Sequence, residues 1–448
     1  MNSFEDFNLK KQLNYAIEDL GFKEPTPIQK AAFPVVLSGK DIVGIAQTGT
    51  GKTMAYMLPL LHELTFSKQI HPRVLVLVPT RELVIQVVEN IKSYAKYINV
   101  RVLGVYGGTN MNTQKQFCAQ GTDILVATPG RLYDLALCKA VKLKEIKKLV
   151  IDEVDVMLDL GFRFQLTNIF ELLPTKRQNI MFSATMTTDV DALIDDFFTV
   201  PEKVSIAVSG TPLENIAQSA YAVPNFYTKV NLLIRLLKDK DTFQKVLVFV
   251  SNKKSADVVF ESIEATFSNE VCVIHSNKTQ NYRMRSIRQF DEGKNRILVT
   301  TDVMARGLDL DKITHVINFD TPNYPENYMH RIGRTGRAAH QGNSILLFTE
   351  KETSDKEAIE ALMDYEIPLM KMPPKVEISE ELRPEERPRV LEADNPDQTT
   401  LESQGSFHEK SEKNKKTNQG GSYQRIIAKK YSKPKTRGDK NYNRRNKK

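Results

Sequence analysis

Short apolar runs alternate with stretches of helical periodicity along the first half of the chain. The runs are nearly continuous, which fits strands that are buried on both faces of a parallel sheet. Helical spacing follows at residues 82–96 and again at 190–198. This alternation is the βαβ pattern of an α/β domain, which we predict for residues 1–208. The strands predicted in this domain cover residues 74–79, 124–129, 148–153 and 179–185.

The same pattern starts again in the second half and predicts another α/β domain over residues 217–372. Residues 209–216 contain a Gly-Thr-Pro sequence and are the predicted linker. The strands predicted in the second domain cover residues 246–251, 270–275, 296–302, 314–320 and 343–349.

The composition changes at Pro373, where a segment rich in Pro and Glu begins and is followed by a basic segment. Neither composition can bury enough apolar area to fold alone, so we predict a disordered tail over residues 373–448. Residues 405–448 hold 15 Lys and Arg against 3 Asp and Glu, a net charge of +12. Because the whole chain carries +8, the remaining residues carry −4. The basic tail can attract polyanions such as RNA, although it can also be simply a solvated segment.

Other features of the composition limit the class of protein. No apolar run approaches the roughly 18–20 residues of a membrane helix, and the start of the chain is polar and acidic. We therefore expect a cytoplasmic protein without membrane contact. Cysteines occur at positions 118, 138 and 272 without a paired spacing, which indicates neither a disulfide framework nor a zinc site.

The strongest local motif is AQTGTGKT, which follows the apolar stretch 42–45 and fits a phosphate-binding loop with alanine at its first position. Glycines let backbone N–H groups surround phosphate oxygens without a Cβ in the way. Lys52 would reach the β- and γ-phosphates, and the Thr53 hydroxyl would ligate Mg²⁺. A glycine-rich turn between strand and helix is the alternative. The nucleotide-binding residues predicted here are Ala46, Gln47, Thr48, Gly49, Thr50, Gly51, Lys52 and Thr53.

A second motif, LVIDEVD, places Asp152 and Glu153 at the end of an apolar run. In a phosphate-loop fold, an acid at this point holds Mg²⁺ and its neighbour orients or deprotonates the attacking water. A solvated acidic cluster is the alternative, which the upstream loop makes weaker. Together the two motifs indicate hydrolysis of a nucleoside triphosphate.

Further motifs occur in an order that resembles the DEAD-box RNA helicases over residues 4–370. GFKEPTPIQ, at residues 21–29, is similar to the Q motif of that family. The naming motif reads Asp-Glu-Val-Asp here, with Val154 in place of alanine and the acids retained. The other similar motifs are PTREL (79–83), the glycine pair 107–108, TPGR (128–131), SAT (183–185), VFVSNKKSA (248–256), the spacing 280, 283, 290, 293, TTDVMARGLDL (300–310) and HRIGRTGR (330–337).

The resemblance implies two RecA-like domains, ATP and Mg²⁺ as cofactors, and RNA as partner. Lys52, Asp152 and Glu153 would be catalytic, with Arg334 and Arg337 as arginine fingers from the second domain. The resemblance implies Gln29, Phe22 and Thr26 at the adenine and Asp309 at the ribose. It implies RNA contacts by Pro79, Thr80, Arg81, Gly108, Thr128, Arg131 and Thr300. It implies coupling of hydrolysis to strand separation by Asp155, Ser183, Thr185 and His330.

The family mechanism is RNA-stimulated ATP hydrolysis that drives short-range, non-processive unwinding, and we expect a monomer to perform it. Three alternatives stay open on the sequence: a DNA translocase of the same superfamily, an ATP-gated RNA clamp that does not unwind, and a binding module without activity. The Q motif argues against the first, and retention of the catalytic acids and arginines argues against the last.

Overall fold

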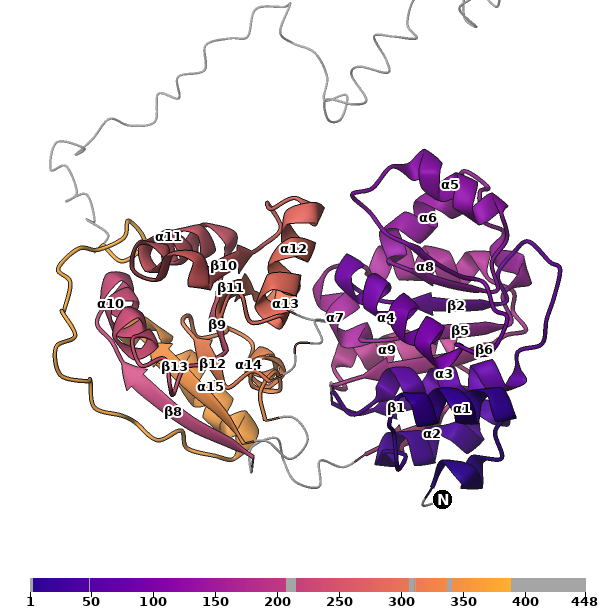
Figure 1. Ribbon diagram of the computed structural model, residues 1–448, viewed down its shortest axis with the longest axis horizontal. Helices are drawn as coiled ribbons and strands as arrows, with labels where there is room; N and C mark the ends of the chain where they lie inside the picture. Colours follow the sequence, from indigo (N-terminus) through magenta and orange to yellow (C-terminus); the bar gives the residue numbers. More distant parts are fainter. Residues whose placement is uncertain are drawn as a thin grey trace, which may run out of the picture. The chain divides into compact units, whose positions relative to one another are not determined.

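The computed structural model describes residues 3–47, 49–206, 215–305, 310, 312–336 and 341–387, without the side chain of Val303 (Figure 1). These residues form two α/β domains, each built on a parallel sheet of its own, as predicted. The predicted tail beyond residue 387 and most of the predicted linker lie outside the described residues. Among the described residues, no helix is both long enough and apolar enough to cross a membrane.

Domain 1 is built on a seven-stranded parallel sheet in the order β3-β4-β2-β5-β6-β1-β7. Its strands are β1 (Ile42–Ile45), β2 (Val74–Leu77), β3 (Val102–Val105), β4 (Ile124–Ala127), β5 (Lys148–Ile151), β6 (Gln178–Ser183) and β7 (Glu202–Ser205). Its helices are η1 (Phe4–Phe7), α1 (Lys11–Asp19), α2 (Pro27–Leu37), α3 (Lys52–Glu63), α4 (Arg81–Tyr94), α5 (Met111–Ala119), α6 (Pro129–Leu137), η2 (Leu143–Glu145), α7 (Val154–Asp159), α8 (Arg163–Leu172) and α9 (Thr188–Phe197).

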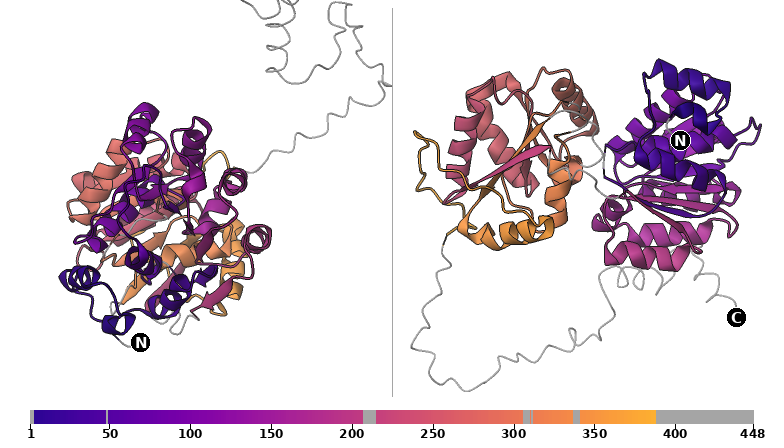
Figure 2. Two further views of the ribbon diagram at one scale, coloured as in Figure 1. Left: turned by 90° about the vertical axis from the view of Figure 1, so that its right-hand side faces the viewer. Right: turned by 90° about the horizontal axis from the view of Figure 1, so that it is seen from below.

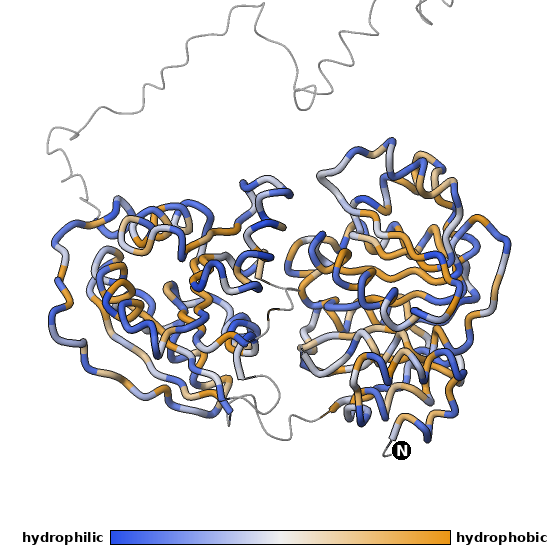
Figure 3. Tube along the Cα trace, in the orientation of Figure 1, coloured by the Kyte–Doolittle hydropathy of each residue, from blue (hydrophilic) through white to orange (hydrophobic). Residues whose placement is uncertain are grey.

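Alternate residues of the strands in domain 1 point to two separate cores, one on each face of the sheet. Val150 belongs to the core with α2, α3 and α4, whereas Leu149 and Ile151 belong to the core with α6 to α9. The right-hand view of Figure 2 shows the sheet between these two helical layers. The hydropathy colours of Figure 3 follow the same arrangement, with the strands most hydrophobic. Burial on both faces explains why the central strands read as continuous apolar runs.

Domain 2 is built on a six-stranded parallel sheet in the order β10-β11-β9-β12-β13-β8. Its strands are β8 (Ile216–Ala222), β9 (Val246–Val250), β10 (Val271–Ile274), β11 (Ile297–Thr301), β12 (His315–Asn318) and β13 (Gly342–Phe348). Its helices are α10 (Phe226–Leu237), α11 (Lys253–Phe267), η3 (Ser268–Glu270), α12 (Gln280–Asp291), α13 (Asp302–Ala305), α14 (Pro325–Ile332), η4 (Glu350–Glu352) and α15 (Thr353–Met363).

From the sequence, β1 was identified only as the apolar stretch 42–45. Three further strands were not predicted, and each of these three lies at the edge of its sheet. These are β3 and β7 in domain 1 and β8 in domain 2. The fourth edge strand, β10, is buried throughout and was predicted, whereas each of these three strands has one neighbour and contains residues that are not fully buried. Their sequences therefore contain polar residues or glycine and lack the continuous apolar run of a central strand.

The prediction that a disordered tail begins at residue 373 is wrong for residues 373–386, which pack on domain 2. Arg383 donates a hydrogen bond from Nη1 to Ser255 Oγ (2.9 Å), and its guanidinium lies 4.4 Å from the ring centre of Phe226. Glu386 Oε1 accepts a hydrogen bond from the backbone N–H of Phe226 (2.7 Å). Polar contacts with helix N-termini hold this segment, so it has no apolar periodicity that a sequence pattern could reveal.

Candidate active site

Carboxyl ends of parallel strands meet at one side of a sheet, which we call its carboxyl end. In domain 1 the phosphate-loop motif follows β1, the acid pair follows β5, and SAT lies at the end of β6. The topology places β1, β6 and β5 side by side. Three motifs that lie far apart in the sequence are therefore brought together at the carboxyl end of this sheet.

The phosphate loop leads directly into α3, whose first residue is Lys52. Gly51 has a φ of 84°, and a Cβ added there would lie 2.5 Å from Gln29 Nε2, so the position requires glycine. Lys52 is only 6% exposed, and its Nζ has no hydrogen-bond partner among the described residues. A buried ammonium group at a helix N-terminus is suited to an anion such as a phosphate. Thr48, a predicted loop residue, lies outside the described residues.

Asp152 follows β5 and is 3% exposed. Its Oδ2 accepts a hydrogen bond from the Tyr56 hydroxyl (3.0 Å), and its Oδ1 accepts one from the Glu153 backbone N–H (3.0 Å). Burial raises the pKa of Asp152, against the opposing charge of Lys52. The carboxylate is thus fixed in orientation beside the phosphate loop.

Glu153 has a left-handed backbone, with φ 53° and ψ 51°. A left-handed conformation is unfavourable for a residue with a side chain and is characteristic of functional sites. The side chain is 6% exposed, and its Oε2 has no hydrogen-bond partner within the described part of the chain. Burial raises the pKa of Glu153, while the charge of Lys52 opposes this effect. A carboxylate in this environment can accept a proton from a bound water.

The Q motif is joined to the phosphate loop by hydrogen bonds. Gln29 Oε1 accepts from the Thr26 N–H (2.9 Å), and Gln29 Nε2 donates to the Gly51 carbonyl (3.3 Å). Thr26 Oγ1 donates to the carbonyl of Thr50 (2.8 Å). The oxygen and the nitrogen of the Gln29 amide are therefore both hydrogen-bonded within the protein. A contact with adenine would replace or share one of these hydrogen bonds. Phe22 is 46% exposed and has a ring surface available for stacking.

Asp155 connects the acid motif to the SAT motif. Its Oδ2 accepts hydrogen bonds from the Thr185 backbone N–H (3.1 Å) and hydroxyl (2.9 Å). Ser183 Oγ instead donates to the Thr185 carbonyl (2.6 Å). Val154 is fully buried, so its two additional methyl groups point into the core and do not separate Asp155 from Thr185.

Another group of predicted residues lies where β2, β3 and β4 end. The Arg81 guanidinium packs so closely on Gly108 that a Cβ at this glycine, whose φ is 77°, would overlap it. Arg131 donates to the Thr109 carbonyl from Nη1 and Nη2 (3.2 Å each) and to Gln114 Oε1 from Nη1 (2.9 Å). Arg81 and Arg131 thus both support the glycine loop.

The remaining residues predicted to contact RNA are largely buried. Thr80 caps α4 by accepting a hydrogen bond from the Leu83 N–H (3.3 Å), and Pro79 and Thr128 are buried beside it and at the start of α6. In domain 2, Thr300 is fully buried near the end of β11. Contacts with a ligand at these positions would use the backbone more than the side chains.

Family models match both domains of the chain. The DEAD/DEAH box helicase model matches residues 26–193, and the helicase conserved C-terminal domain model matches residues 228–339. The chain is 38% identical over 372 residues to the DEAD-box ATP-dependent RNA helicase CshA of Bacillus subtilis, covering 83% of this chain and 74% of that protein. The chain belongs to the DEAD-box helicase family. It is therefore an ATP-dependent RNA helicase, as the resemblance implied.

Solved structures agree with this assignment. S. cerevisiae Dbp5 bound to RNA and ADP BeF3 matches with a TM-score of 0.75 and 28% identity, over 83% of this chain and 96% of that one. Mss116p bound to ssRNA and AMP-PNP also matches with a TM-score of 0.75, at 26% identity, over 83% and 79% of the two chains. These matches confirm two RecA-like domains in the DEAD-box chain.

In domain 2 of this helicase, α14 ends with the first three residues of the HRIGRTGR motif. His330 and Arg331 lie in its last turn, and Arg334 follows the helix and is 4% exposed. Arg337 and Asp309, two predicted site residues, lie outside the described residues.

Arg331 has a structural role that sequence reasoning missed. Its Nε and Nη2 donate to the two carboxylate oxygens of Asp302 (2.6 and 2.8 Å), and its Nη1 donates to the Asp320 carbonyl (2.7 Å). The guanidinium also lies 5.1 Å from the ring centre of Phe249. Arg331 thereby ties α14 to β9, β12 and the start of α13. Two motifs that were quoted separately, TTDVMARGLDL and HRIGRTGR, each supply one member of this ion pair.

Proposed function

We propose that the carboxyl end of the domain 1 sheet binds ATP with Mg²⁺ and that Glu153 directs hydrolysis. The observation that carries this proposal is Lys52, a buried ammonium group without a hydrogen-bond partner among the described residues, whose charge acts on both Asp152 and Glu153. Lys52 would bind the β- and γ-phosphates, with backbone N–H groups of the loop around them.

The side chains at the end of the phosphate loop and after β5 are chemically suited to bind a magnesium ion. Thr53 and Asp152 provide the hydroxyl and carboxylate oxygens that Mg²⁺ prefers, and Asp152 is held rigidly by two donors. Thr53 would bind directly and Asp152 partly through water. The bound ion would neutralise charge that develops on the phosphates during transfer.

Glu153 would orient the attacking water and take its proton. Its buried carboxylate supports this role, because Oε2 has no hydrogen-bond partner among the described residues and so can accept from a water. From domain 2, Arg334 and Arg337 would stabilise the transition state, in which negative charge spreads over the γ-phosphate. Arginines in this role are worth about 10³–10⁵ in rate.

At the base and sugar, Gln29, Phe22 and Thr26 would recognise adenine, and Asp309 would bind ribose. Gln29 and Thr26 are hydrogen-bonded to the phosphate loop, which would link recognition of the base to the loop. Adenine recognition that exchanges the Gly51 partner of Gln29 would change the loop that holds the phosphates. The base and the triphosphate would then be recognised together.

RNA would bind domain 1 where β2, β3 and β4 end, at Arg81, Gly108 and Arg131, with Pro79, Thr80 and Thr128 beside them. On domain 2 it would contact Thr300. Contacts with phosphate and sugar position a strand without reading its sequence. Because ATP and RNA would both favour the closed form of the two domains, each would raise the affinity for the other. The outcome would be local, non-processive unwinding of RNA duplexes and remodelling of RNA–protein complexes.

Coupling of hydrolysis to strand separation would pass through Asp155, Ser183, Thr185 and His330. The two hydrogen bonds from Thr185 to Asp155 support this, because they connect the loop after β5 with the end of β6. We further propose a cytoplasmic monomer whose basic segment 405–448 tethers RNA, which its charge of +12 supports.

The Glu153→Gln variant tests the catalytic assignment. Glutamine keeps the size of the side chain but cannot take a proton, so we expect ATP affinity to stay within a few-fold and hydrolysis to fall about 10²–10⁴-fold. Equilibrium binding of ATP and steady-state phosphate release, both with RNA present, measure the two effects. Glu171→Gln, an exposed change on α8, is the matched control. Hydrolysis that survives in Glu153→Gln would contradict the proposed role.

A further inference from the structure

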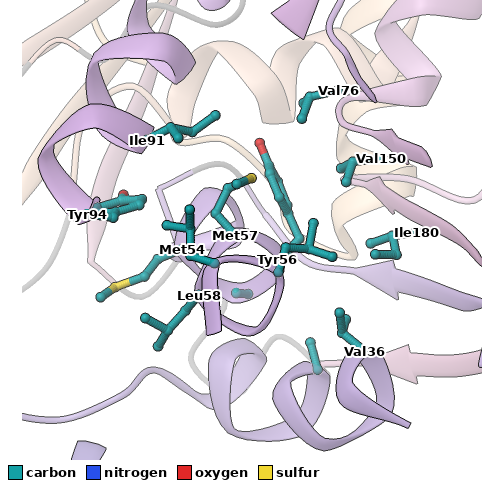
Figure 4. Close-up of a cluster of buried hydrophobic side chains, with 14 of the residues drawn as sticks. Val36, Met54, Tyr56, Met57, Leu58, Val76, Ile91, Tyr94, Val150 and Ile180 are labelled. Carbon is teal, nitrogen blue, oxygen red and sulfur yellow. The ribbon is translucent and has the colours of Figure 1, made fainter. Parts of the chain in front are cut away.

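Tyr56 is a polar side chain in the core directly beneath the proposed magnesium site. It lies in α3, one helical turn after Lys52, and is fully buried. Its ring packs in the core of domain 1 with Val76 and Val150, two residues that face each other across β2 and β5 (Figure 4). The ring centre also lies 5.6 Å from that of Phe182. An aromatic ring satisfies this packing, so packing alone does not require the hydroxyl.

The hydroxyl meets Asp152 because of strand geometry. Side chains two residues apart point to the same face of a sheet, so Asp152 lies on the same face as Val150. The ring of Tyr56 lies over that face, and its hydroxyl donates to Asp152 Oδ2 at 3.0 Å. Asp152 Oδ1 receives the Glu153 N–H at 3.0 Å. One donor on each oxygen fixes the plane of the carboxylate.

Burying a hydroxyl is unfavourable unless it finds a partner, and here the partner is the proposed magnesium-site acid. Each carboxylate oxygen has a second lone pair, so the donor from Tyr56 leaves Asp152 able to accept from a metal-bound water. Thr53, the other residue proposed at the ion, lies in the same helix, three residues before Tyr56.

We propose that Tyr56 is a positioning residue for the magnesium site, acting by orienting the Asp152 carboxylate. This inference rests on the proposed role of Asp152 in holding Mg²⁺. Partners that orient metal ligands in this way typically contribute about 10–100-fold to metal affinity or activity. Here the effect belongs at the lower limit of that range, because Asp152 would bind partly through water.

The Tyr56→Phe variant removes the hydroxyl and keeps the ring. We expect the Mg²⁺ concentration that gives half-maximal tightening of ADP binding to rise about tenfold. Binding of ADP in EDTA should not change, because the phosphate loop is untouched. Titration of a fluorescent ADP analogue with and without Mg²⁺ measures both. Tyr133→Phe, which loses a hydroxyl bonded to Asn168 at 3.4 Å in the same domain, is the control and should behave as wild type.

The Asp152→Asn background separates positioning from a general structural role. There, Tyr56→Phe should have no further effect on the Mg²⁺ dependence, since the carboxylate that it orients is gone. Equal weakening of ADP binding with and without Mg²⁺, or an unchanged Mg²⁺ dependence, would overturn the inference while leaving the proposed function intact. A wild-type protein whose ADP binding ignores Mg²⁺ would instead overturn the proposed magnesium site itself.

Discussion

Two buried cations, Lys52 in domain 1 and Arg331 in domain 2, have opposite surroundings. Lys52 is 6% exposed and lacks a hydrogen-bond partner among the described residues, whereas Arg331 is 2% exposed and is held by Asp302, the Asp320 carbonyl and Phe249. Burying a charge without a partner is costly, and folding alone does not account for it. The hydrogen-bonded cation is therefore part of the framework, whereas Lys52 is the cation that we propose to bind a ligand.

Both cations belong to conspicuous motifs, and a motif does not say which of its basic residues faces the ligand. In HRIGRTGR, Arg331 lies between His330 and Arg334 in sequence but is committed to the fold. The contrast suggests a practical criterion: a buried basic residue with all its donors used is structural, whatever motif contains it. Removing each cation should then affect different properties.

The largest effect is expected for Arg331→Met. The change leaves Asp302 without its bidentate partner, and losing one member of a buried ion pair costs about 3–5 kcal/mol of unfolding free energy. Urea denaturation of the full chain, followed by circular dichroism, measures this loss. Arg235→Met, an exposed change on α10, is the control. Stability equal to that of the control would show that Arg331 is not part of the framework.

Lys52→Ala should mainly reduce activity, whereas Arg331→Met should mainly reduce stability. Loss of the phosphate-binding cation should lower RNA-stimulated ATP hydrolysis about 10²–10³-fold. Thermal stability without nucleotide should fall less than in Arg331→Met, because Lys52 Nζ has no hydrogen-bond partner among the described residues and acts on Asp152 and Glu153 only through its charge. Phosphate release and thermal melting measure the two properties, with Lys92→Ala on the exposed face of α4 as control. Destabilisation as large as that of Arg331→Met would mean that Lys52 is part of the framework of the fold.

Thr185→Val tests the connection between the acid motif and the SAT motif. Valine removes the hydroxyl bond to Asp155 but keeps the backbone bond, so about 1.5–3 kcal/mol of a charge-assisted interaction is lost. We expect strand separation to fall about tenfold or more while ATP hydrolysis changes far less. Duplex unwinding and phosphate release are compared in the same samples, with the exposed Thr175→Val as control. Equal losses in both assays would argue against a coupling role.

The smallest effect is expected for Arg383→Ala in segment 373–386. This arginine is also a paired cation, but it lies on the surface of domain 2, where a cation–π contact contributes about 0.5–1 kcal/mol. Urea denaturation should detect a loss of this size. Glu380→Gln changes an exposed side chain in the same segment, without touching the ion pair between Arg383 and Glu385, and should have no effect.

The central strands of both sheets were predictable because burial on two faces requires continuous apolar runs. The edge strands β3, β7 and β8 escaped prediction because one neighbour and partial exposure permit polar residues. Segment 373–386 escaped it because side-chain caps and a cation–π contact hold it, and these leave no periodic pattern.

Residues of the proposed site also differ in how readily the sequence reveals them. The residues that we propose at the nucleotide stand in recognisable motifs, so Lys52, Asp152 and Glu153 could be proposed without a structure. A residue that we propose to act through one of these, Tyr56, looks like an ordinary core position in the sequence. Tyr56 and Asp152 are separated by 96 positions, and only the packing of α3 on β5 brings the hydroxyl to the carboxylate.

The most direct test of the account is ATP hydrolysis by the full chain with single-stranded RNA, with single-stranded DNA of equal length, and with neither. We predict strong stimulation by RNA alone, lost in Glu153→Gln, because RNA contacts on both domains would favour the form in which Arg334 and Arg337 reach the nucleotide. Equal stimulation by DNA, or hydrolysis that ignores both polymers, would contradict it.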